Sequence, residues 1–496
     1  MIEKLSNWFG NTEINRRINT VGSWLIIGLA AGLRLIGLNY PPKLVFDETY
    51  YVKDAYTLLK TGSEKSWPND PNPAFESGQV NSFLSDPSFV VHPPLGKWII
   101  ALGMWLFGAE NPFSWRIGVA LIGIASVALL IVTAKLVLKS HTWANVAGLL
   151  MAIEGGAIVM SRTGLLDAIL GFFALAAFFA LVKDAQTRNL QIQTFNRPWL
   201  WLMALMLGAA TAVKWSGLYF AAAFGLYLVV SEALSRRRIQ QERWAARGFI
   251  GQGLRSFFIV APTVVVTYVA SWFGWFATNG GYDRDWAELA ENRWTGPWSW
   301  VPTSIQSWIH YHQEILGFHV NLKTPHSYQA NPLTWLFNVR PTSFFYEGLK
   351  NGEGGCTDPS GCASAITALA HPLIWLAATA ALFVLIYFVI RYRDRTAGLI
   401  LIGMAGGYLP WLAIMGRTVF QFYAIAFTPW MMLALAYVLR SYMASAAPEK
   451  RGRQIWIILS FLAASLAITI YFLPIWLGTW VPYWFWHAHM WLPSWI

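Results

Sequence analysis

Long apolar runs, separated by short polar segments, occupy most of the chain. A helix needs roughly 20 residues to cross about 30 Å of hydrocarbon, although roughly 17 can suffice. By this measure the pattern predicts about eleven transmembrane helices, and hence an all-α polytopic membrane protein. The predicted spans lie near Gly22–Leu38, Ile117–Leu138, Trp143–Met160, Leu165–Val182, Pro198–Val213, Trp215–Val230, Phe257–Phe276, Pro372–Ile390, Ala397–Met415, Val419–Leu439 and Ile455–Leu477.

A further apolar run, Leu95–Phe107, is too short to cross comfortably and lies between Pro93-Pro94 and Gly108. We therefore predict a helix that lies in the membrane interface. The basic residues agree, because every basic cluster then falls on one side of the membrane, as the positive-inside rule expects. These clusters are Arg16 with Arg17, Lys135 with Lys139, Lys183 with Arg188 and Arg197, Arg236 to Arg238 with Arg243 and Arg247, Arg391 with Arg393 and Arg395, and Arg440 with Lys450, Arg451 and Arg453.

This topology places the N-terminus in the cytoplasm and the C-terminus outside, with two large external loops. The tail is expected to anchor in the membrane interface through its tryptophans. The predicted parts are the cytoplasmic N-terminus with the first span (1–39), an external catalytic loop with interfacial helices (40–114), spans two to seven (115–276), a second external loop (277–368), spans eight to eleven (369–477) and a Trp-rich external tail (478–496).

The composition excludes an ordinary soluble protein, since 56% of the residues are hydrophobic and only 12% are charged. The net charge of +11 does not indicate nucleic-acid binding, because the bases collect in short loops between spans. The only two cysteines, Cys356 and Cys362, lie in one Gly-rich segment of the second external loop. They can pair if that loop faces an oxidising compartment, and the sequence leaves their state open.

Several charged residues lie where this topology does not expect them. Asp47 and Glu48 directly follow the first span, where a carboxylate can act as a general base or can cap the next helix. Other charges lie at the outer ends of spans: Arg34, Arg116, Arg162, Lys214 and Arg417, with Glu154 and Asp167. Ionisable groups in spans usually face a cavity, and arginine and lysine suit a phosphate. We therefore predict an external substrate site formed by Arg116, Arg162, Asp167, Lys214 and Arg417; mutual pairing or contact with lipid headgroups is the structural alternative.

Histidines are further candidates. His92 opens the segment His92-Pro93-Pro94-Leu95-Gly96-Lys97, and both His92 and Lys97 are candidate substrate-binding residues, although an ordinary loop histidine is the alternative at His92. Four more histidines crowd the second external loop: His310, His312, His319 and His326. Their spacing matches neither HExxH nor a cysteine-based zinc motif. The sequence therefore predicts no metal site and no cofactor, and it leaves dependence on a divalent cation open.

Four segments together resemble the protein O-mannosyltransferases, which are membrane glycosyltransferases of the GT-C class. They occur in the family's order over most of the chain: Phe46-Asp47-Glu48, His92 to Lys97, Ser161-Arg162-Thr163-Gly164-Leu165-Leu166-Asp167 and Lys214-Trp215-Ser216-Gly217. The second external loop is too short for the β-trefoil MIR domains of fungal and animal members. In this the chain is similar to the bacterial, particularly actinobacterial, branch.

The resemblance implies a GT-C architecture and transfer of mannose from polyprenyl phosphate mannose to Ser or Thr of secreted or membrane proteins, with inversion at the sugar carbon. The active site is then expected on the outer face of the plasma membrane. Carried over to this sequence, the family's roles make Asp47 the base and Glu48 a supporting carboxylate. They make Arg116, Arg162 and Arg417 the candidates for the phosphate.

Two other functions remain open. A related GT-C transferase, such as an aminoarabinose lipid A transferase, would use the same kind of donor with a lipid or glycan acceptor. A transporter of an anionic lipid would place its site near the midplane and show paired halves, whereas the charges here lie at one face and no halves repeat. The sequence does not reveal the polyprenol length, the acceptor proteins, which of Asp47 and Glu48 is the base, the oligomeric state, or whether the enzyme acts beside the secretion channel.

Overall fold

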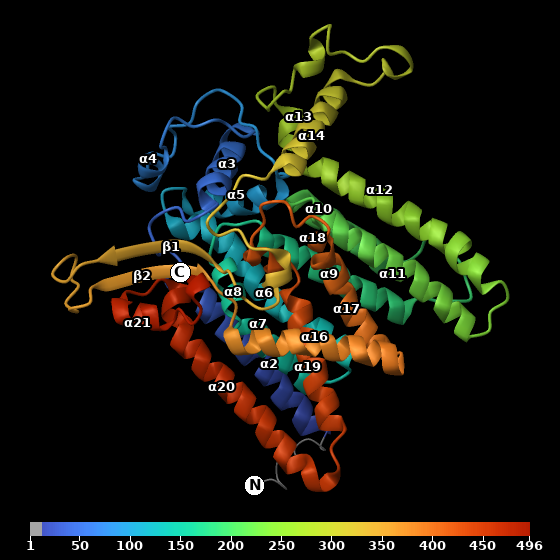
Figure 1. Ribbon diagram of the computed structural model, residues 1–496. Helices are drawn as coiled ribbons and strands as arrows, with labels where there is room; N and C mark the ends of the chain where they lie inside the picture. The colour runs from blue at the N-terminus through green and yellow to red at the C-terminus, as the bar shows by residue number, and fades with distance from the viewer. Residues whose placement is uncertain (1–11) are drawn as a thin grey trace.

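The computed structural model describes residues 12–496, so the first eleven residues of the predicted cytoplasmic N-terminus lie outside the described part. Within the described residues, seven helices are long and apolar enough to cross a membrane. They form most of the bundle in Figure 1 and each matches a predicted span. They are α2 (Thr12–Leu35), α6 (Pro112–Leu138), α9 (Asp167–Thr187), α11 (Gly217–Arg238), α12 (Gly253–Ser271, preceded by the π-helical turn Ala246–Gln252), α16 (Pro372–Tyr392) and α20 (Arg451–Leu477).

The other predicted spans are short or interrupted. The short one is α10 (Pro198–Val213), with 16 residues. Three predicted spans are each divided: α7 (His141–Ala152) with α8 (Gly155–Met160), α17 (Arg395–Gly407) with α18 (Leu409–Leu412), and the 3-10 helix η4 (Gln421–Ala426) with α19 (Thr428–Ala444). Pro410 and Pro429 lie in the first turns of α18 and α19, where proline's missing amide hydrogen costs no helical hydrogen bond. The helical positions are confirmed, and the count of eleven crossings stays a prediction.

The predicted interfacial segment is the helix α5 (Leu95–Phe107). One side of α5 packs against α6 and α10, and Gly103 makes this approach possible. A Cβ at Gly103 would lie 2.1 Å from the carbonyl oxygen of Ser114 on α6, so only glycine fits there. The outer part of α5 exposes Trp105 and Phe107. The exposed apolar side fits the predicted place at a membrane interface.

The prediction of an all-α fold is wrong in the second external loop. There β1 (Thr342–Leu349) and β2 (Cys362–Ala368) form an antiparallel hairpin, and β3 (Val481–Pro482) from the tail pairs with β2. Figure 1 shows this hairpin projecting from one side of the bundle. Cys356 and Cys362 form a disulfide between the two strands' connection and β2, which answers the question that the sequence left open.

Short helices and turns make up the rest of the described secondary structure. They are α3 (Glu48–Thr61), α4 (Asn72–Glu76), α13 (Phe273–Ala277), α14 (Thr303–Asn321), α15 (Pro332–Trp335) and α21 (Tyr483–Ala488), with 3-10 turns at Trp286–Glu288, Gly296–Trp298, Pro448–Lys450 and Pro493–Trp495. The tail is more than an interfacial anchor, because Trp495 is buried and donates its Nε1–H to the carbonyl of Asn338 at 2.8 Å. Trp484 and Trp491 remain exposed, as the predicted anchor requires.

Candidate active site

The turn before α3 gives two neighbouring carboxylates different surroundings. Phe46 has a left-handed backbone conformation, with φ of 48°, which is uncommon for a bulky residue. Its ring is held by Phe344 and Phe420, with centroids 5.0 and 5.7 Å away. Asp47 is the N-cap residue of α3 but makes no capping hydrogen bond through its side chain. The Asp47 carboxylate is therefore available for other interactions, whereas Glu48 belongs to the first turn of the helix.

Glu48 is fully buried and its carboxylate is completely used by the protein. It accepts hydrogen bonds from the backbone N–H groups of Val45 at 3.0 Å and Gly164 at 2.7 Å. Arg116 donates to both of its oxygens, from Nε at 2.9 Å and from one Nη at 2.8 Å. Such a bidentate pair fixes position as well as charge. Glu48 thus joins α3 to α6 and to the loop before α9.

Arg116 and Arg162 are both bound to backbone carbonyls. All five N–H groups of Arg116 are bound, because those not used by Glu48 donate to the backbone carbonyls of Leu38, Pro41 and Lys43. Arg162 donates to three carbonyls at the end of α2: those of Leu33, Ile36 and Gly37. The structure therefore shows the two arginines holding the end of α2 and the loop that follows it, and neither lines the cavity described below.

Asp47 is partly exposed and lies close to charged residues of the spans. Burial raises the pKa of Asp47 to about 6 against the opposing effect of Lys214, while Asp167 adds to the rise and a hydrogen bond with Tyr51 opposes it. A carboxylate with this pKa is ionised at neutral pH and is basic enough to accept a proton efficiently. Asp47, rather than Glu48, has the surroundings of a general base.

A cavity of about 400 Å³ lies next to these charges. Its lining carries three cations, Lys214, Lys323 and Arg417, against one carboxylate, Asp167. The remaining lining residues are His92, Trp215, Ser216, Tyr219, Leu316, His319, Val320, Trp411, Ile414, Gly416 and Tyr423. The cavity thus combines a net positive charge with apolar and aromatic groups, which suits an anionic group attached to an apolar chain.

Two of the three cations have defined partners within the cavity. Lys214 Nζ lies 2.8 and 3.0 Å from the two oxygens of Asp167. Arg417 donates from one Nη to His319 Nδ1 at 2.9 Å, and its buried Nε has no hydrogen-bond partner among the described residues. His319 Nε2 lies 2.9 Å from the carbonyl of Val91, so Nε2 carries the proton and Nδ1 accepts. Burial and the charge of Arg417 lower the pKa of His319 to about 4. His319 is therefore a neutral partner of Arg417 at neutral pH.

His92 lies at the same cavity and is partly buried. Its ring stacks on His319, with centroids 5.4 Å apart, and its Nδ1 has no hydrogen-bond partner within residues 12–496. Burial lowers the pKa of His92 well below its ordinary value, and Lys214 adds to this effect. A neutral imidazole with an unpaired nitrogen is therefore available to a bound ligand. Of the predicted substrate-binding residues, His92, Asp167, Lys214 and Arg417 meet here.

Lys97 does not reach this cavity. Its side chain is 1% exposed, and its Nζ pairs with Glu64 and lies 3.9 Å from Asp54. Burial raises the pKa of Asp54 to about 7, against the opposing charge of Lys97. This buried cluster connects α5 to α3 and to the loop that follows α3. The structure therefore places the predicted substrate residue Lys97 in a contact between α5, α3 and the loop after α3.

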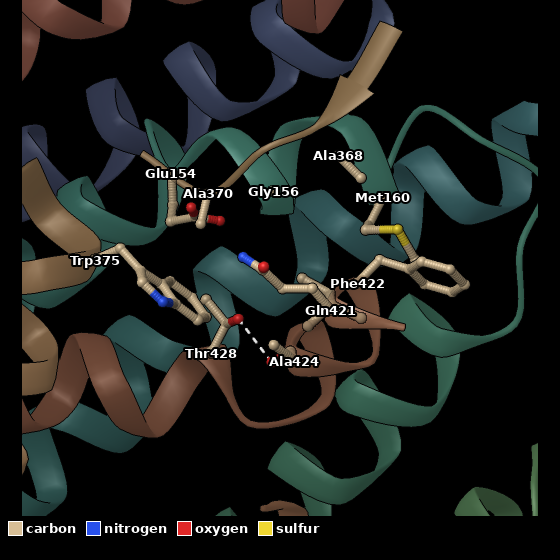
Figure 2. Close-up of a pocket in the computed structure, with 11 residues that line it drawn as sticks. Glu154, Gly156, Met160, Ala368, Ala370, Trp375, Gln421, Phe422, Ala424 and Thr428 are labelled. Carbon is tan, nitrogen blue, oxygen red and sulfur yellow. Dashed lines mark hydrogen bonds between the residues drawn. The ribbon is translucent and has the colours of Figure 1, made fainter. Parts of the chain in front are cut away.

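Glu154 and Arg34 both bind backbone groups at the interruption between α7 and α8. Glu154 is the N-cap of α8 and accepts hydrogen bonds from the backbone N–H groups of Ala157 at 2.6 Å and His371 at 2.8 Å. Arg34 donates to the carbonyls at the end of α7. Figure 2 shows Glu154 and Gln421 at a small pocket of about 20 Å³, which has room for about one water molecule. Both charges therefore satisfy backbone groups of a broken helix.

Several residues at the cavity were not predicted to form the site. Trp215 Nε1 donates to the Tyr268 hydroxyl at 2.8 Å, and that hydroxyl lies 2.8 Å from His312 Nε2. His312 Nδ1 lies 2.7 Å from the carbonyl of Trp308, so Nδ1 carries the proton and Nε2 accepts from Tyr268. This directed chain fixes the Trp215 ring in the lining. His319, Lys323 and Tyr423 were also missed, since only the crowding of histidines in the loop marked this region.

Solved structures with the same arrangement define the class of fold. The structure of the S. cerevisiae protein O-mannosyltransferase Pmt1-Pmt2 complex bound to the sugar donor matches with a TM-score of 0.74 at 15% identity, over 96% of this chain and 92% of that chain. The structure of ArnT from Cupriavidus metallidurans bound to undecaprenyl phosphate matches with a TM-score of 0.51 at 15% identity. This match covers 92% of this chain and 74% of that chain. These likenesses show the fold of the GT-C membrane glycosyltransferases.

Sequence comparison then gives the family. The model for dolichyl-phosphate-mannose-protein mannosyltransferase matches residues 107–238, and the model for the C-terminal four TMM region of protein-O-mannosyltransferase matches residues 304–495. The polyprenol-phosphate-mannose–protein mannosyltransferase of Mycolicibacterium smegmatis is 30% identical over 95% of this chain and 92% of its own length. That of Corynebacterium glutamicum is 29% identical over 95% and 93%. The chain belongs to the polyprenol-phosphate-mannose–protein mannosyltransferase family, as its motifs indicated.

Proposed function

We propose that this multi-pass membrane protein transfers mannose from polyprenyl phosphate mannose to Ser or Thr hydroxyls of secreted or membrane proteins, at the outer face of the plasma membrane. The observation that carries the proposal is the cavity beside Asp47, with Lys214, Lys323 and Arg417 in its lining. Family membership supports the choice of donor and acceptor.

The donor's phosphate binds the cations of this cavity. Arg417 offers the part of its guanidinium fork that lines the cavity, and Lys323 and Lys214 add point charges. The polyprenyl chain follows Leu316 and Val320 of α14, whose side chains are 53% and 64% exposed. Exposed apolar residues at the rim of a charged cavity suit a ligand that keeps its tail in lipid.

The reaction is a single displacement. The Asp47 carboxylate takes the proton from the Ser or Thr hydroxyl while the hydroxyl oxygen forms a bond to the anomeric carbon of mannose. The bond between that carbon and the phosphate oxygen breaks on the opposite face, so the configuration inverts. The electron pair of the broken bond stays on polyprenyl phosphate, where preorganised cations stabilise the added charge. No covalent enzyme intermediate and no second carboxylate are needed.

The proposed topology has eleven crossings, with the N-terminus in the cytoplasm and the cavity outside. The disulfide between Cys356 and Cys362 supports an outer location for the second external loop, because disulfides persist in oxidising compartments. The basic clusters lie on the opposite side of the predicted topology, which the positive-inside rule assigns to the cytoplasm. Labelling single introduced cysteines with a membrane-impermeant maleimide in whole cells tests this arrangement.

The direct test of function uses membranes that contain the protein, a radiolabelled polyprenyl phosphate mannose and a Ser/Thr peptide. Label in the peptide supports the proposal. Label in lipid instead of peptide would assign the chain to a transferase with a lipid acceptor, and no transfer to either acceptor would contradict both.

The pH dependence should follow Asp47. Because burial raises the pKa of Asp47 to about 6, and because the base must be ionised, kcat/KM should be level above that pH and fall about tenfold per pH unit below it. Initial rates measured from about pH 4.5 to 8 test this. Donor binding measured at the same pH values is the control, because it separates a loss of binding from a loss of the base.

Replacing Arg417 by alanine should lower kcat/KM for the donor about 10- to 100-fold, the effect of losing hydrogen bonds to a charged group. The chain offers Arg391→Ala as a control, because Arg391 is exposed at the end of α16. Steady-state kinetics with varied donor check the prediction. Equal kinetics for the Arg417 variant and the control would remove Arg417 from the phosphate site.

A further inference from the structure

A second cluster of polar side chains lies on the external side, away from the cavity. Asp283 follows α13, and His310 and Glu314 lie one turn apart on α14. One possible ligand atom from each residue lies within 4.8 Å of the other two. Among the described residues, this is the one group of three His, Cys, Asp or Glu side chains close enough together to hold a metal ion. His310 Nε2 is 3.4 Å from Asp283 Oδ2 and 3.7 Å from Glu314 Oε1.

These two distances are too long for ordinary hydrogen bonds, which measure about 2.7–3.2 Å between nitrogen and oxygen. They fit a different arrangement. Around a tetrahedral metal ion with bonds of about 2.0–2.1 Å, two neighbouring ligand atoms are about 3.3 Å apart. The 3.4 Å distance from His310 to Asp283 matches this spacing, and the 3.7 Å distance to Glu314 exceeds it by a few tenths of an ångström.

The surroundings hold two of the three side chains, His310 and Glu314, in place. The His310 ring stacks on Trp286, with centroids 3.9 Å apart and an angle of 7° between the planes. The Tyr282 hydroxyl donates to Glu314 Oε2 at 3.2 Å, which leaves Oε1 directed at His310. Outer contacts of this kind orient the ligands of metal sites.

The charges of the cluster also favour a cation. Asp283 and Glu314 place two carboxylates beside the single imidazole of His310. Two neighbouring carboxylates repel each other when both are ionised. A bound cation removes this repulsion.

We propose that Asp283, His310 and Glu314 bind a divalent transition-metal ion of the zinc type. One imidazole and two carboxylates are suitable zinc ligands, and a water molecule completes four-fold coordination. The ion would tie the loop of residues 278–302 to α14. It takes no part in sugar transfer, because His310 lies nine helical positions from His319 at the cavity, about 14 Å along the axis.

The test measures bound metal in the full-length protein. The protein is purified through an affinity tag that contains no histidine. The protein is stripped with a chelator, incubated with zinc, desalted and analysed by inductively coupled plasma mass spectrometry. We expect about one equivalent of zinc in the wild type and a zinc-dependent rise in melting temperature. Both effects should be lost in His310→Ala and Glu314→Gln, and both should persist in His487→Ala, which removes an exposed histidine of the tail.

Since His310 also packs on Trp286, its replacement can disturb the loop by itself. Asp283→Asn and Glu314→Gln change charge with little change in shape, so they decide the question if His310→Ala does not fold. The proposal is overturned if the wild type retains no zinc, if the carboxamide variants retain as much as the wild type, or if His487→Ala loses it equally. None of these readouts depends on mannose transfer.

Discussion

Replacing Asp47 by asparagine should reduce mannose transfer to the peptide about 10²- to 10⁴-fold, which is the usual contribution of a general base. Asparagine has nearly the same shape but accepts no proton at neutral pH. The fold should be unaffected, because the Asp47 side chain makes no capping hydrogen bond to α3. The transfer assay and a thermal melt in detergent, performed on the same preparation, check both parts.

Asp86→Asn is the matched control for this variant, since Asp86 is an exposed carboxylate of the same external loop. It should transfer mannose at the wild-type rate. Asp47 would lose its assigned role if its variant kept most of the activity, or if its loss of activity accompanied a large fall in melting temperature.

The largest effect on stability is expected from Glu48→Gln. Glutamine has no charge and only one acceptor oxygen, so the buried guanidinium of Arg116 loses its counter-charge and the N–H donors that share Glu48 lose one of two acceptors. Breaking a buried ion pair in this way costs about 3–5 kcal/mol. We expect low yields of folded protein and a large fall in the melting temperature of what remains.

Glu347→Gln provides the comparison. Glu347 pairs with Lys43 at 3.2 Å, but both side chains are well exposed, at 39% and 51%. Exposed pairs of this kind contribute less than about 1 kcal/mol, so this variant should melt like the wild type. A Glu48→Gln protein that melts normally yet transfers no mannose would mean that Glu48 acts in the chemistry, and it would reopen the choice of base.

The sequence predicted the helices well because hydrophobicity alone specifies where a chain can lie in a bilayer. It did not predict their interruptions, since an apolar window averages over a break such as the one between α7 and α8. The hairpin was missed for a related reason. The strand Cys362–Ala368 contains three alanines, which are not typical of strands, and its burial comes from contacts with the distant α20 and the tail.

The site was predicted in part. Asp47, His92, Asp167, Lys214 and Arg417 were recognised by charge or motif, and the fold brings them together. Arg116, Arg162 and Lys97 were assigned to the site for the same reasons, yet they bind carbonyls or buried carboxylates. A charge near the end of a span shows that a partner is needed, but backbone carbonyls are invisible in the pattern of side chains.

Because Glu48 forms a bidentate ion pair with Arg116, the order of Asp47 and Glu48 along the chain matters. An aspartate at position 48 would be shorter by one carbon–carbon bond, about 1.5 Å, and would fall short of the Arg116 fork. A glutamate at position 47 would be longer by the same amount. Its carboxylate would therefore lie beyond the position that the turn at Phe46 gives to the Asp47 carboxylate. Swapping the two letters would leave composition and net charge identical, yet neither side chain would be the right length for its task.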